Sequence, residues 1–273
     1  MAVLGNLRDP HLFPFTRKLG QWLGRETESF FESVGLIVVM TGQIAGFVSK
    51  GRVKWKHFAD QFSFVGLDTL GVALTMTTFS GMVIALQVAT EMVKQGAENY
   101  VGALVSMALL RELAPIMTGF SVIAMSGSAY AAELSTMQIT SQVDALKVLH
   151  VHPVRYLVVP RVLGAITALP IITVITATSG ILGGMLISNL LADVHPGVYL
   201  DSVWQVIEYK DIFGAMFKAA VFGYLIAMIA TSIGINTKGG AKEVGEATTR
   251  AVVWSFVAMA IFDYVLTYFI YGN

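Results

Sequence analysis

The stretch of sequence that decides the fold is YLVVPRVLGAITALPIITVITATSGILGGMLISNLL, residues 156–191. Arg161 is its only charged residue, and the stretch is longer than the about 20 mostly apolar residues that a membrane-spanning helix needs. Four further stretches meet the same criterion: 65–93, 100–132, 212–235 and 251–271. The sequence therefore predicts an all-α polytopic membrane protein with five transmembrane helices.

The composition supports a membrane protein and argues against other classes. Only 13% of the 273 residues are charged and 55% are hydrophobic, whereas a soluble domain has about 25% charged residues. The 18 basic residues balance the 18 acidic ones, so no net charge attracts nucleic acid. The sequence has no Cys, no GxxxxGK[ST] phosphate-binding loop and no His–carboxylate cluster at metal-ligand spacing. We predict no catalytic residues, no metal site and no cofactor in this chain.

The basic residues predict the orientation, because Lys and Arg collect in cytoplasmic loops. With five spans and a cytoplasmic N-terminus, fourteen of the 18 basic residues lie on the cytoplasmic side: Arg8, Arg17, Lys18, Arg25, Lys50, Arg52, Lys54, Lys56, Lys147, Arg155, Arg161, Lys238, Lys242 and Arg250. A sixth apolar stretch, Phe30–Val48, would place the run Lys50–Lys56 on the opposite side if it crossed. We therefore interpret it as a re-entrant or interfacial segment.

The chain divides at about residue 62. Residues 11–31 have the pattern of an amphipathic surface helix, so residues 1–62 are predicted to form N-terminal interfacial and elbow helices. Residues 63–273 form the five-span domain. No transit peptide is visible at the N-terminus, which favours a bacterial inner membrane over a chloroplast envelope.

Charged side chains inside the spans are candidates for function, since a charge in the hydrocarbon region costs at least about 2.5–3.5 kcal/mol. Arg111 and Glu112 lie within the sequence LRELAP, and Asp263 lies within the last span. Pro115 lacks the N–H that would bond the Arg111 carbonyl, which predicts a kink and a free acceptor beside the charges. Asp263 is a candidate partner for Arg111, while Lys218 is assigned to the outer side. Either a structural ion pair or a direct role in transport explains these charges.

Three other patterns concern packing and partners. The connection 131–147 joins the second and third spans, and Ser141 with Asp144 resembles a capping box that starts a helix from Gln142 to about His150. That helix either lies on the membrane or inserts into a cytoplasmic partner. Three glycines permit close helix approach: Gly180, Gly183 and Gly184. A stripe in the first span faces lipid, another helix or a cavity for acyl chains: Ile84, Val88 and Met92.

Several stretches also match a known family. They are LLRELAP (109–115), AAEL (131–134) with Met137, QVDAL (142–146), Pro153, Pro160-Arg161, ATTRAVV (247–253), DYVLT (263–267) and Gly272-Asn273. Through them, residues 65–273 resemble the MlaE family of ABC-transporter permeases, which takes part in phospholipid trafficking in the Mla system. The family usually has Gly-Arg where this sequence has Ala124-Met125. The second span therefore lacks one basic group, and Arg111 is expected to be more isolated.

The resemblance implies a homodimeric permease that exchanges phospholipid between the bacterial inner membrane and a periplasmic MCE-domain protein, in support of outer-membrane lipid asymmetry. It also implies a separate cytoplasmic ATPase, which holds ATP and Mg, and a small STAS-domain protein. The helix that couples to the ATPase would lie within about residues 133–150, with these candidate residues: Glu133, Leu134, Met137, Gln142, Asp144 and Leu146. The cavity that such permeases form between subunits gives these candidate lipid-binding residues: Ile84, Val88, Met92, Gln95, Arg111, Glu112 and Leu113.

Rival functions follow from the same residues. An ion-coupled secondary transporter would use the intramembrane polar residues Arg111, Glu112 and Asp263 and would need no ATPase. A membrane enzyme acting on lipids is disfavoured, because the sequence has no His–carboxylate cluster. A purely structural scaffold would keep its lipid-transfer level when Glu112 is replaced by Ala.

Overall fold

The structure is a computed structural model that describes residues 35, 37–49 and 55–272. Five of its helical stretches are long and apolar enough to cross a membrane: 55–94, 98–139, 154–192, 209–235 and 241–271. The prediction of an all-α protein with five spans is confirmed. The helices extend beyond the apolar stretches, because backbone hydrogen bonding continues into polar residues that have good helix propensity.

The first two spans are built differently. The first is one uninterrupted helix, α2, Trp55–Lys94. The second consists of six consecutive segments: η2 (Glu98–Tyr100), α3 (Val101–Ala108), η3 (Leu109–Leu113), α4 (Ala114–Val122), η4 (Ile123–Gly127) and α5 (Ser128–Ile139). Of these, η3 and η4 are π-helical, so the second span changes its helical pitch twice before it ends.

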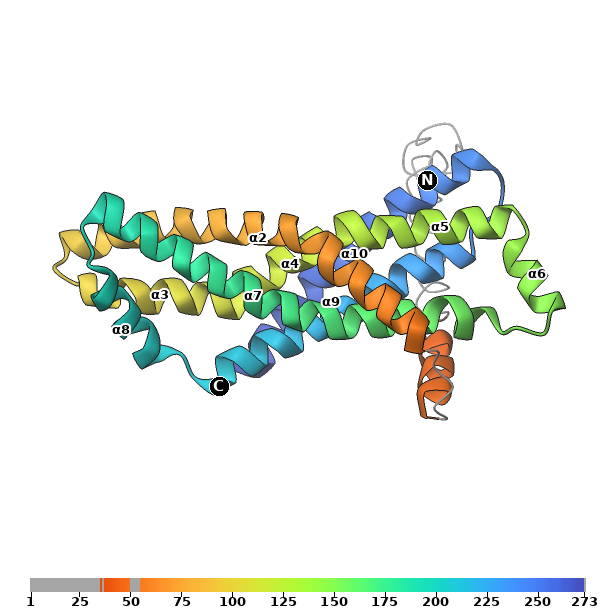
Figure 1. Cartoon of the computed structure of the whole chain (residues 1–273), viewed down its shortest axis with the longest axis horizontal. Coiled ribbons are helices and arrows are strands. Elements are labelled where there is room, and N and C mark those ends of the chain that lie inside the picture. Colours follow the sequence, from red (N-terminus) through yellow and green to blue (C-terminus); the bar gives the residue numbers. More distant parts are fainter. Residues whose placement is uncertain (1–34, 36, 50–54, 273) are drawn as a thin grey trace, which may run out of the picture.

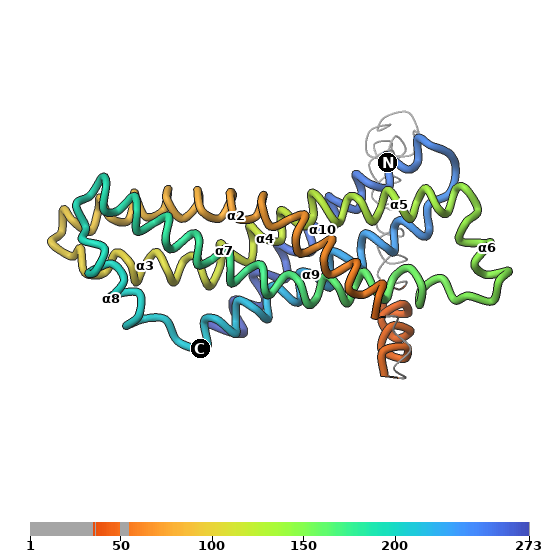
Figure 2. The backbone as a smooth tube through the Cα atoms, in the orientation of Figure 1, coloured from red at the N-terminus to blue at the C-terminus, as the bar shows by residue number. Residues whose placement is uncertain are grey.

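The remaining helices complete the bundle. They are α6 (Gln142–Val148), the π-helical η5 (Val154–Val158), α7 (Val159–Ala192), α8 (Pro196–Val206), α9 (Tyr209–Ile235) and α10 (Ala241–Tyr271). The spans lie side by side in an elongated bundle, with α6 at one end and α8 at the other (Figures 1 and 2). We call these the α6 end and the α8 end.

The most extensive helix contact joins α2 and α7. Gly81 of α2 meets Gly180 of α7, where a Cβ added to Gly81 would overlap the carbonyl oxygen of Gly180. Around Gly183 and Gly184 the same added atom would lie within 3 Å of Thr78 and Tyr199 respectively. These glycines therefore allow the backbones to touch, as predicted from the small-residue pattern.

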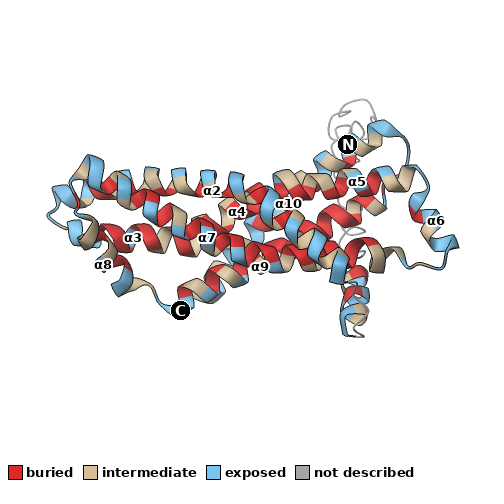
Figure 3. Cartoon of the chain, viewed as in Figure 1, coloured by how far each residue is buried: buried red, intermediate tan, exposed pale blue. Residues whose placement is uncertain are grey.

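Two main apolar clusters fill the interior of the bundle. One includes Tyr130 and Phe222, and the other lies toward the α8 end and includes Leu109 and Tyr199. Buried positions follow the inner faces of the helices and exposed ones the outer faces (Figure 3). Exposed apolar side chains such as Phe79 of α2 are expected on a surface that faces lipid.

A shorter apolar helix, Ile37–Ser49, runs across the long axis of the bundle at the α6 end (Figure 1). It has fewer than the about 20 residues needed for a span. Met40 and Ile44 are buried against the bundle, and the Thr41 hydroxyl hydrogen-bonds the Tyr224 hydroxyl. The interpretation of Phe30–Val48 as a re-entrant or interfacial segment stays a prediction. The surface helix predicted for residues 11–31 lies outside the described residues.

Candidate functional site

The charged motif of the second span lies in the π-helix η3. Backbone bonding skips one residue here, so that the Ala114 N–H donates to the Leu109 carbonyl. Pro115 follows immediately and has no N–H to offer the Arg111 carbonyl. That carbonyl instead accepts a hydrogen bond from Lys218 Nζ at 2.8 Å. The acceptor predicted from Pro115 is present, and a side chain of α9 fills it.

Lys218 is the centre of a buried charge cluster. Its side chain has 0% exposure, and its Nζ lies 2.8 Å from Glu112 Oε2 and 3.0 Å from Asp263 Oδ1. The contact with Asp263 is an ion pair without the angle of a hydrogen bond. Together with the Arg111 carbonyl, three oxygens surround an ammonium that has three N–H donors. The assignment of Lys218 to the outer side is wrong, because α9 begins at Tyr209 and carries Lys218 more than two turns into the bundle.

The last helix completes the cluster from the other side. Asp263 and Thr267 are four residues apart on α10 and therefore share a face. The Thr267 hydroxyl donates to Glu112 Oε1 at 2.9 Å, so both oxygens of Glu112 have partners. Three helical segments, η3, α9 and α10, thus meet at one carboxylate.

Arg111 has a different partner from the one predicted. Its Nε lies 2.7 Å from Oδ1 of Asp211, near the start of α9, and its guanidinium stacks 4.8 Å from the centre of the Tyr271 ring. The predicted pairing of Arg111 with Asp263 is wrong, because Lys218 takes Asp263. Adjacent helical residues point about 100° apart, so Arg111 and Glu112 reach different parts of α9.

Asp211 is held rigidly in that pair. Its side chain is 2% exposed, and its second oxygen accepts the backbone N–H of Glu208 at 3.1 Å, which caps α9. Asp211 and Lys218 are seven residues apart, two helical turns, and so project from one face of α9. On this face of α9, Asp211 pairs with Arg111 and Lys218 pairs with Glu112. Arg111 is consequently not isolated, although Ala124 and Met125 stand where the family has Gly-Arg.

The cluster is both buried and accessible in part. Two cations and three carboxylates form it: Arg111, Lys218, Glu112, Asp211 and Asp263. The side chains of Arg111 and Glu112 keep 30% and 35% of their surface exposed, while Lys218 keeps none. The buried members hold the segments together, and the exposed members offer a cation and an anion to a ligand.

Four of the candidate lipid-binding residues share one apolar cluster. Ile84, Val88 and Met92 of α2 and Leu113 of η3 pack against the same apolar cluster toward the α8 end. All four remain partly exposed. Gln95 follows the last residue of α2 and is exposed. The structure thus links the apolar stripe to η3, the segment of the charged pair, through Leu113.

The candidate coupling residues fall into two groups. Leu134 is fully buried and, with Met137 and Leu146, packs in a small apolar cluster around Val143 and Leu157. These residues hold α6 against the bundle from inside. Glu133, Gln142 and Asp144 are exposed, as are Val148 and Leu149 at the end of α6.

The predicted capping box of α6 is wrong. Ser141 adopts a left-handed conformation with φ of 60°, and its side chain makes no capping hydrogen bond. Asp144 instead forms an exposed ion pair with Lys147 at 2.8 Å. The helix starts at Gln142 as expected and ends at Val148, two residues before His150.

A second ion pair stands at the α6 end. Arg161 is 7% exposed, donates to Glu133 Oε2 at 2.7 Å and to the Leu157 carbonyl at 2.7 Å, and faces the Tyr130 ring. It ties α5 to α7 directly above α6. From the sequence, Glu133 was expected to contact a partner protein. The burial of Arg161 was not predicted, because only its place at the start of an apolar stretch indicated it.

The comparisons with known proteins agree with this architecture. The family model for the permease MlaE matches residues 58–269. The chain belongs to the MlaE permease family. As a member of that family it is a transmembrane subunit of the ABC-transporter type, and the resemblance found in the sequence is confirmed.

Relatives of known description extend the match over nearly the whole chain. A probable ABC transporter permease of Synechocystis is 39% identical over 93% of this chain and 93% of its own length. The chloroplastic protein TRIGALACTOSYLDIACYLGLYCEROL 1 of Arabidopsis thaliana is 38% identical over 86% of this chain and 67% of its own. A probable ABC transporter permease of Rickettsia prowazekii is 36% identical over 92% and 96%.

Proposed function

We propose that this chain moves phospholipid across or out of a bacterial inner membrane, driven by a separate ATPase subunit. The observation that carries the proposal is that η3 holds the partly exposed Arg111–Glu112 pair, while its next residue, Leu113, packs in the same apolar cluster as the stripe of Ile84, Val88 and Met92. A phospholipid needs both surfaces, because its headgroup is charged and its chains are apolar. The name of the Arabidopsis relative is that of a galactolipid, which adds support for a lipid substrate.

The charged pair would act by binding a headgroup. The guanidinium of Arg111 has five N–H donors and spends Nε on Asp211, so its terminal nitrogens are suited to a phosphate. Glu112 would accept from a hydroxyl or ammonium of the headgroup. The acyl chains would lie along the stripe and against Leu113. No covalent step is required.

The energy would enter at α6. We infer that the α6 end faces the cytoplasm, because most of the basic residues that the structure describes gather there. An ATPase that contacts the exposed end of α6 would push on α5, and α5 continues through η4 and α4 into η3. Closure of the ATPase would in this way shift the Arg111–Glu112 pair and release its lipid.

The assembly proposed around this chain follows the family. Two copies would form the lipid cavity between them, with a periplasmic MCE-domain protein at the α8 end. A small STAS-domain protein would act on the cytoplasmic side with the ATPase, which holds ATP and Mg. The exposed apolar faces of α2 and α10 leave room for both lipid and a second copy.

Reconstitution tests this function. The full chain, co-purified from native membranes with its bound subunits, is placed in liposomes with a fluorescent phospholipid, and lipid transfer is followed with and without ATP. We expect ATP-dependent transfer that Glu112→Gln reduces at equal protein level. Transfer driven by an ion gradient without any ATPase would establish the ion-coupled alternative, and recovery of neither ATPase nor phospholipid would contradict the proposal.

A further inference from the structure

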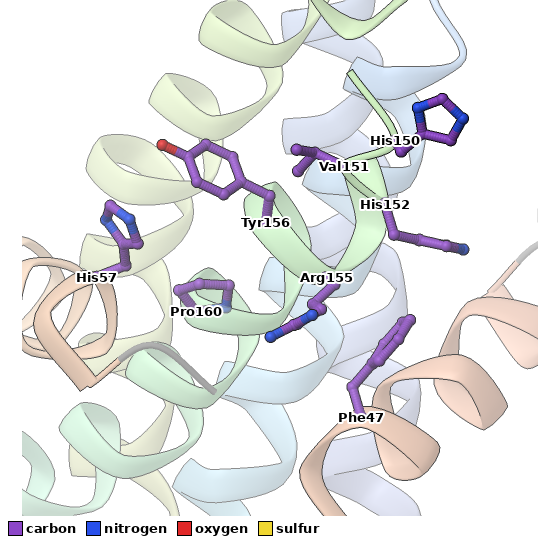
Figure 4. Close-up of a pocket in the computed structure, with 8 residues that line it drawn as sticks. All are labelled: Phe47, His57, His150, Val151, His152, Arg155, Tyr156 and Pro160. Carbon is purple, nitrogen blue, oxygen red and sulfur yellow. The ribbon is translucent and has the colours of Figure 1, made fainter. Parts of the chain in front are cut away.

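We propose that a cavity at the α6 end, apart from the charge cluster of the spans, binds the phosphate group of an anionic ligand, with a membrane phospholipid as the favoured source. The cavity has a volume of about 380 Å³ and is shown in Figure 4. Its lining combines four nitrogen-bearing side chains with apolar walls: Phe47, His57, His150, Val151, His152, Arg155, Tyr156 and Pro160.

The lining comes from three separate parts of the chain. Phe47 belongs to the helix that crosses the bundle, and His57 to the first turn of α2. The others come from the connection after α6, from η5 and from the start of α7 (Figure 4). Two ring contacts set the walls: His57 with Tyr156 at 5.2 Å and His152 with Phe47 at 5.1 Å between ring centres. The imidazoles are therefore placed by packing, and their ring nitrogens remain able to serve a ligand.

The chemistry of the lining selects an anion. Arg155 carries a permanent positive charge, and the described residues that line the cavity include no Asp or Glu. Arg155 already interacts with another residue, but a guanidinium has five donors and can serve more than one acceptor. Each imidazole adds at least one N–H donor. Guanidinium and imidazole donors around a small cavity match the several acceptor oxygens of a phosphate.

The position of the cavity favours a lipid as the source of that phosphate. The helix Ile37–Ser49 exposes Val38, Val39 and Val48, as an interfacial helix in the membrane surface does. Trp55, two residues before His57, is 77% exposed at the same level of the bundle. Aromatic side chains of this kind concentrate where headgroups lie. A headgroup in the cavity would keep its acyl chains beside Phe47 and the apolar helix.

A metal ion does not explain the histidines. Across residues 35, 37–49 and 55–272, no group of three or more potential His, Asp or Glu ligands is close enough to hold one. The cavity also lies at the opposite end of the bundle from α8, near which the lipid-binding candidates Ile84, Val88 and Met92 pack. The phosphate site is therefore independent of the proposed transport function.

A site-specific crosslink tests the proposal. Phe47 is replaced by p-benzoylphenylalanine in the full chain, which is placed in nanodiscs that contain phosphatidylglycerol or, in a second set, diacylglycerol with the same acyl chains. Irradiation and mass spectrometry then measure the lipid attached at position 47. We expect Arg155→Gln to lower the phosphatidylglycerol adduct about tenfold, the factor of one hydrogen bond to a charged group. Lys242→Gln, which removes an exposed charge outside the cavity, is expected to change nothing.

A second variant distinguishes lost ligand binding from a folding defect caused by Arg155→Gln. His57→Phe with His152→Phe keeps both ring contacts and removes the donors, and it is expected to lower the adduct several-fold while the protein elutes as a single species. Dialysis against labelled inorganic phosphate separates the two sources. Phosphate binding that depends on Arg155, without a phosphatidylglycerol adduct, would identify a soluble phosphate compound as the ligand. Two results would overturn the proposal when no phosphate binding is found. One is an equal phosphatidylglycerol adduct in the parent protein and in Arg155→Gln. The other is an equal adduct with phosphatidylglycerol and with diacylglycerol.

Discussion

Lys218 occupies the hydrogen-bonding position that Pro115 leaves open in the second span. Pro115 cannot donate to the Arg111 carbonyl, and Lys218 Nζ does so at 2.8 Å from another helix. The same ammonium neutralises Glu112 at 2.8 Å. The carbonyl that Pro115 leaves without a backbone partner in the second span thus binds the ammonium of Lys218 in α9.

Replacing Lys218 by Met is expected to be the most damaging change in the cluster. It leaves Glu112 and Asp263 without their shared cation in a buried site, where loss of one partner of an ion pair costs about 3–5 kcal/mol. We expect a lowered thermal unfolding midpoint in detergent or nanodiscs. Lys94→Met, at an exposed pair at the end of α2, is the control and should leave the midpoint unchanged.

The double change Lys218→Met with Glu112→Gln separates charge from packing. If uncompensated charge is the cause, the second substitution recovers part of the stability lost in the first. A double variant as unstable as the sum of its single variants would show instead that the stability lost with Lys218 comes from its other contacts, those with Asp263 and the Arg111 carbonyl.

Asp211 offers a way to separate the salt bridge from the helix cap. Asp211→Asn removes the charge that faces Arg111 and can retain an acceptor for the Glu208 N–H, whereas Asp211→Ala removes both. We expect Ala to be less stable than Asn by about 1 kcal/mol, the usual value of a helix cap. Chemical or thermal unfolding of the two variants measures this difference, and equal stabilities would contradict a capping role.

The glycine contact between α2 and α7 gives a matched pair of variants. Gly81→Ala places a methyl group on the Gly180 backbone and is expected to cost about 1–3 kcal/mol through overpacking. Gly71→Ala lies on the same helix with open space around it and should be stabilising by about 0.5–1 kcal/mol. Unfolding midpoints that move in opposite directions would support the contact, and a neutral Gly81→Ala would refute it.

The exposed end of α6 is expected to bind the ATPase. Val148 and Leu149 are apolar, yet they have 76% and 71% of their surface exposed. Changing both to Ser should reduce co-purification of the ATPase at least tenfold and leave the unfolding midpoint of the isolated chain unchanged. Lys147→Gln alters the polar side of the same helix and is the control. Retention of the ATPase by the double variant would place its contact elsewhere.

Glu133 is expected to stabilise the chain through its ion pair with Arg161, in addition to any contact with a partner. Glu133→Gln leaves the guanidinium of Arg161, which is 7% exposed, without its anion. We expect Glu133→Gln to lower the unfolding midpoint measurably. Glu246→Gln, at an exposed ion pair, is the control and should leave the midpoint unchanged. Unfolding of the isolated chain shows this directly, and an unaltered midpoint would assign Glu133 to the partner surface alone.

Hydropathy and backbone chemistry were sufficient for the outline of this fold. The five spans, the close approach at Gly180 and the free acceptor created by Pro115 all follow from local sequence, because each depends on a single helix or a single residue type. The MlaE motifs supplied the family.

The partners of the charges could not be predicted in the same way. Pairing of Arg111 with Asp211, and of Glu112 with Lys218, depends on the rotation of η3 relative to α9. A π-helical segment adds one residue to a turn, so a pattern counted at 3.6 residues per turn loses its register at η3. Lys218 was also misplaced because hydropathy marks where a span is apolar and not where its helix begins.

The π-helix η3 also affects the helical segments that follow it in the second span. A π-helical turn holds one residue more than an α-helical turn, so η3 rotates every residue after it relative to the residues before it. The faces that α4 and α5 present to the rest of the bundle are therefore set at η3, by the same five residues that carry Arg111 and Glu112.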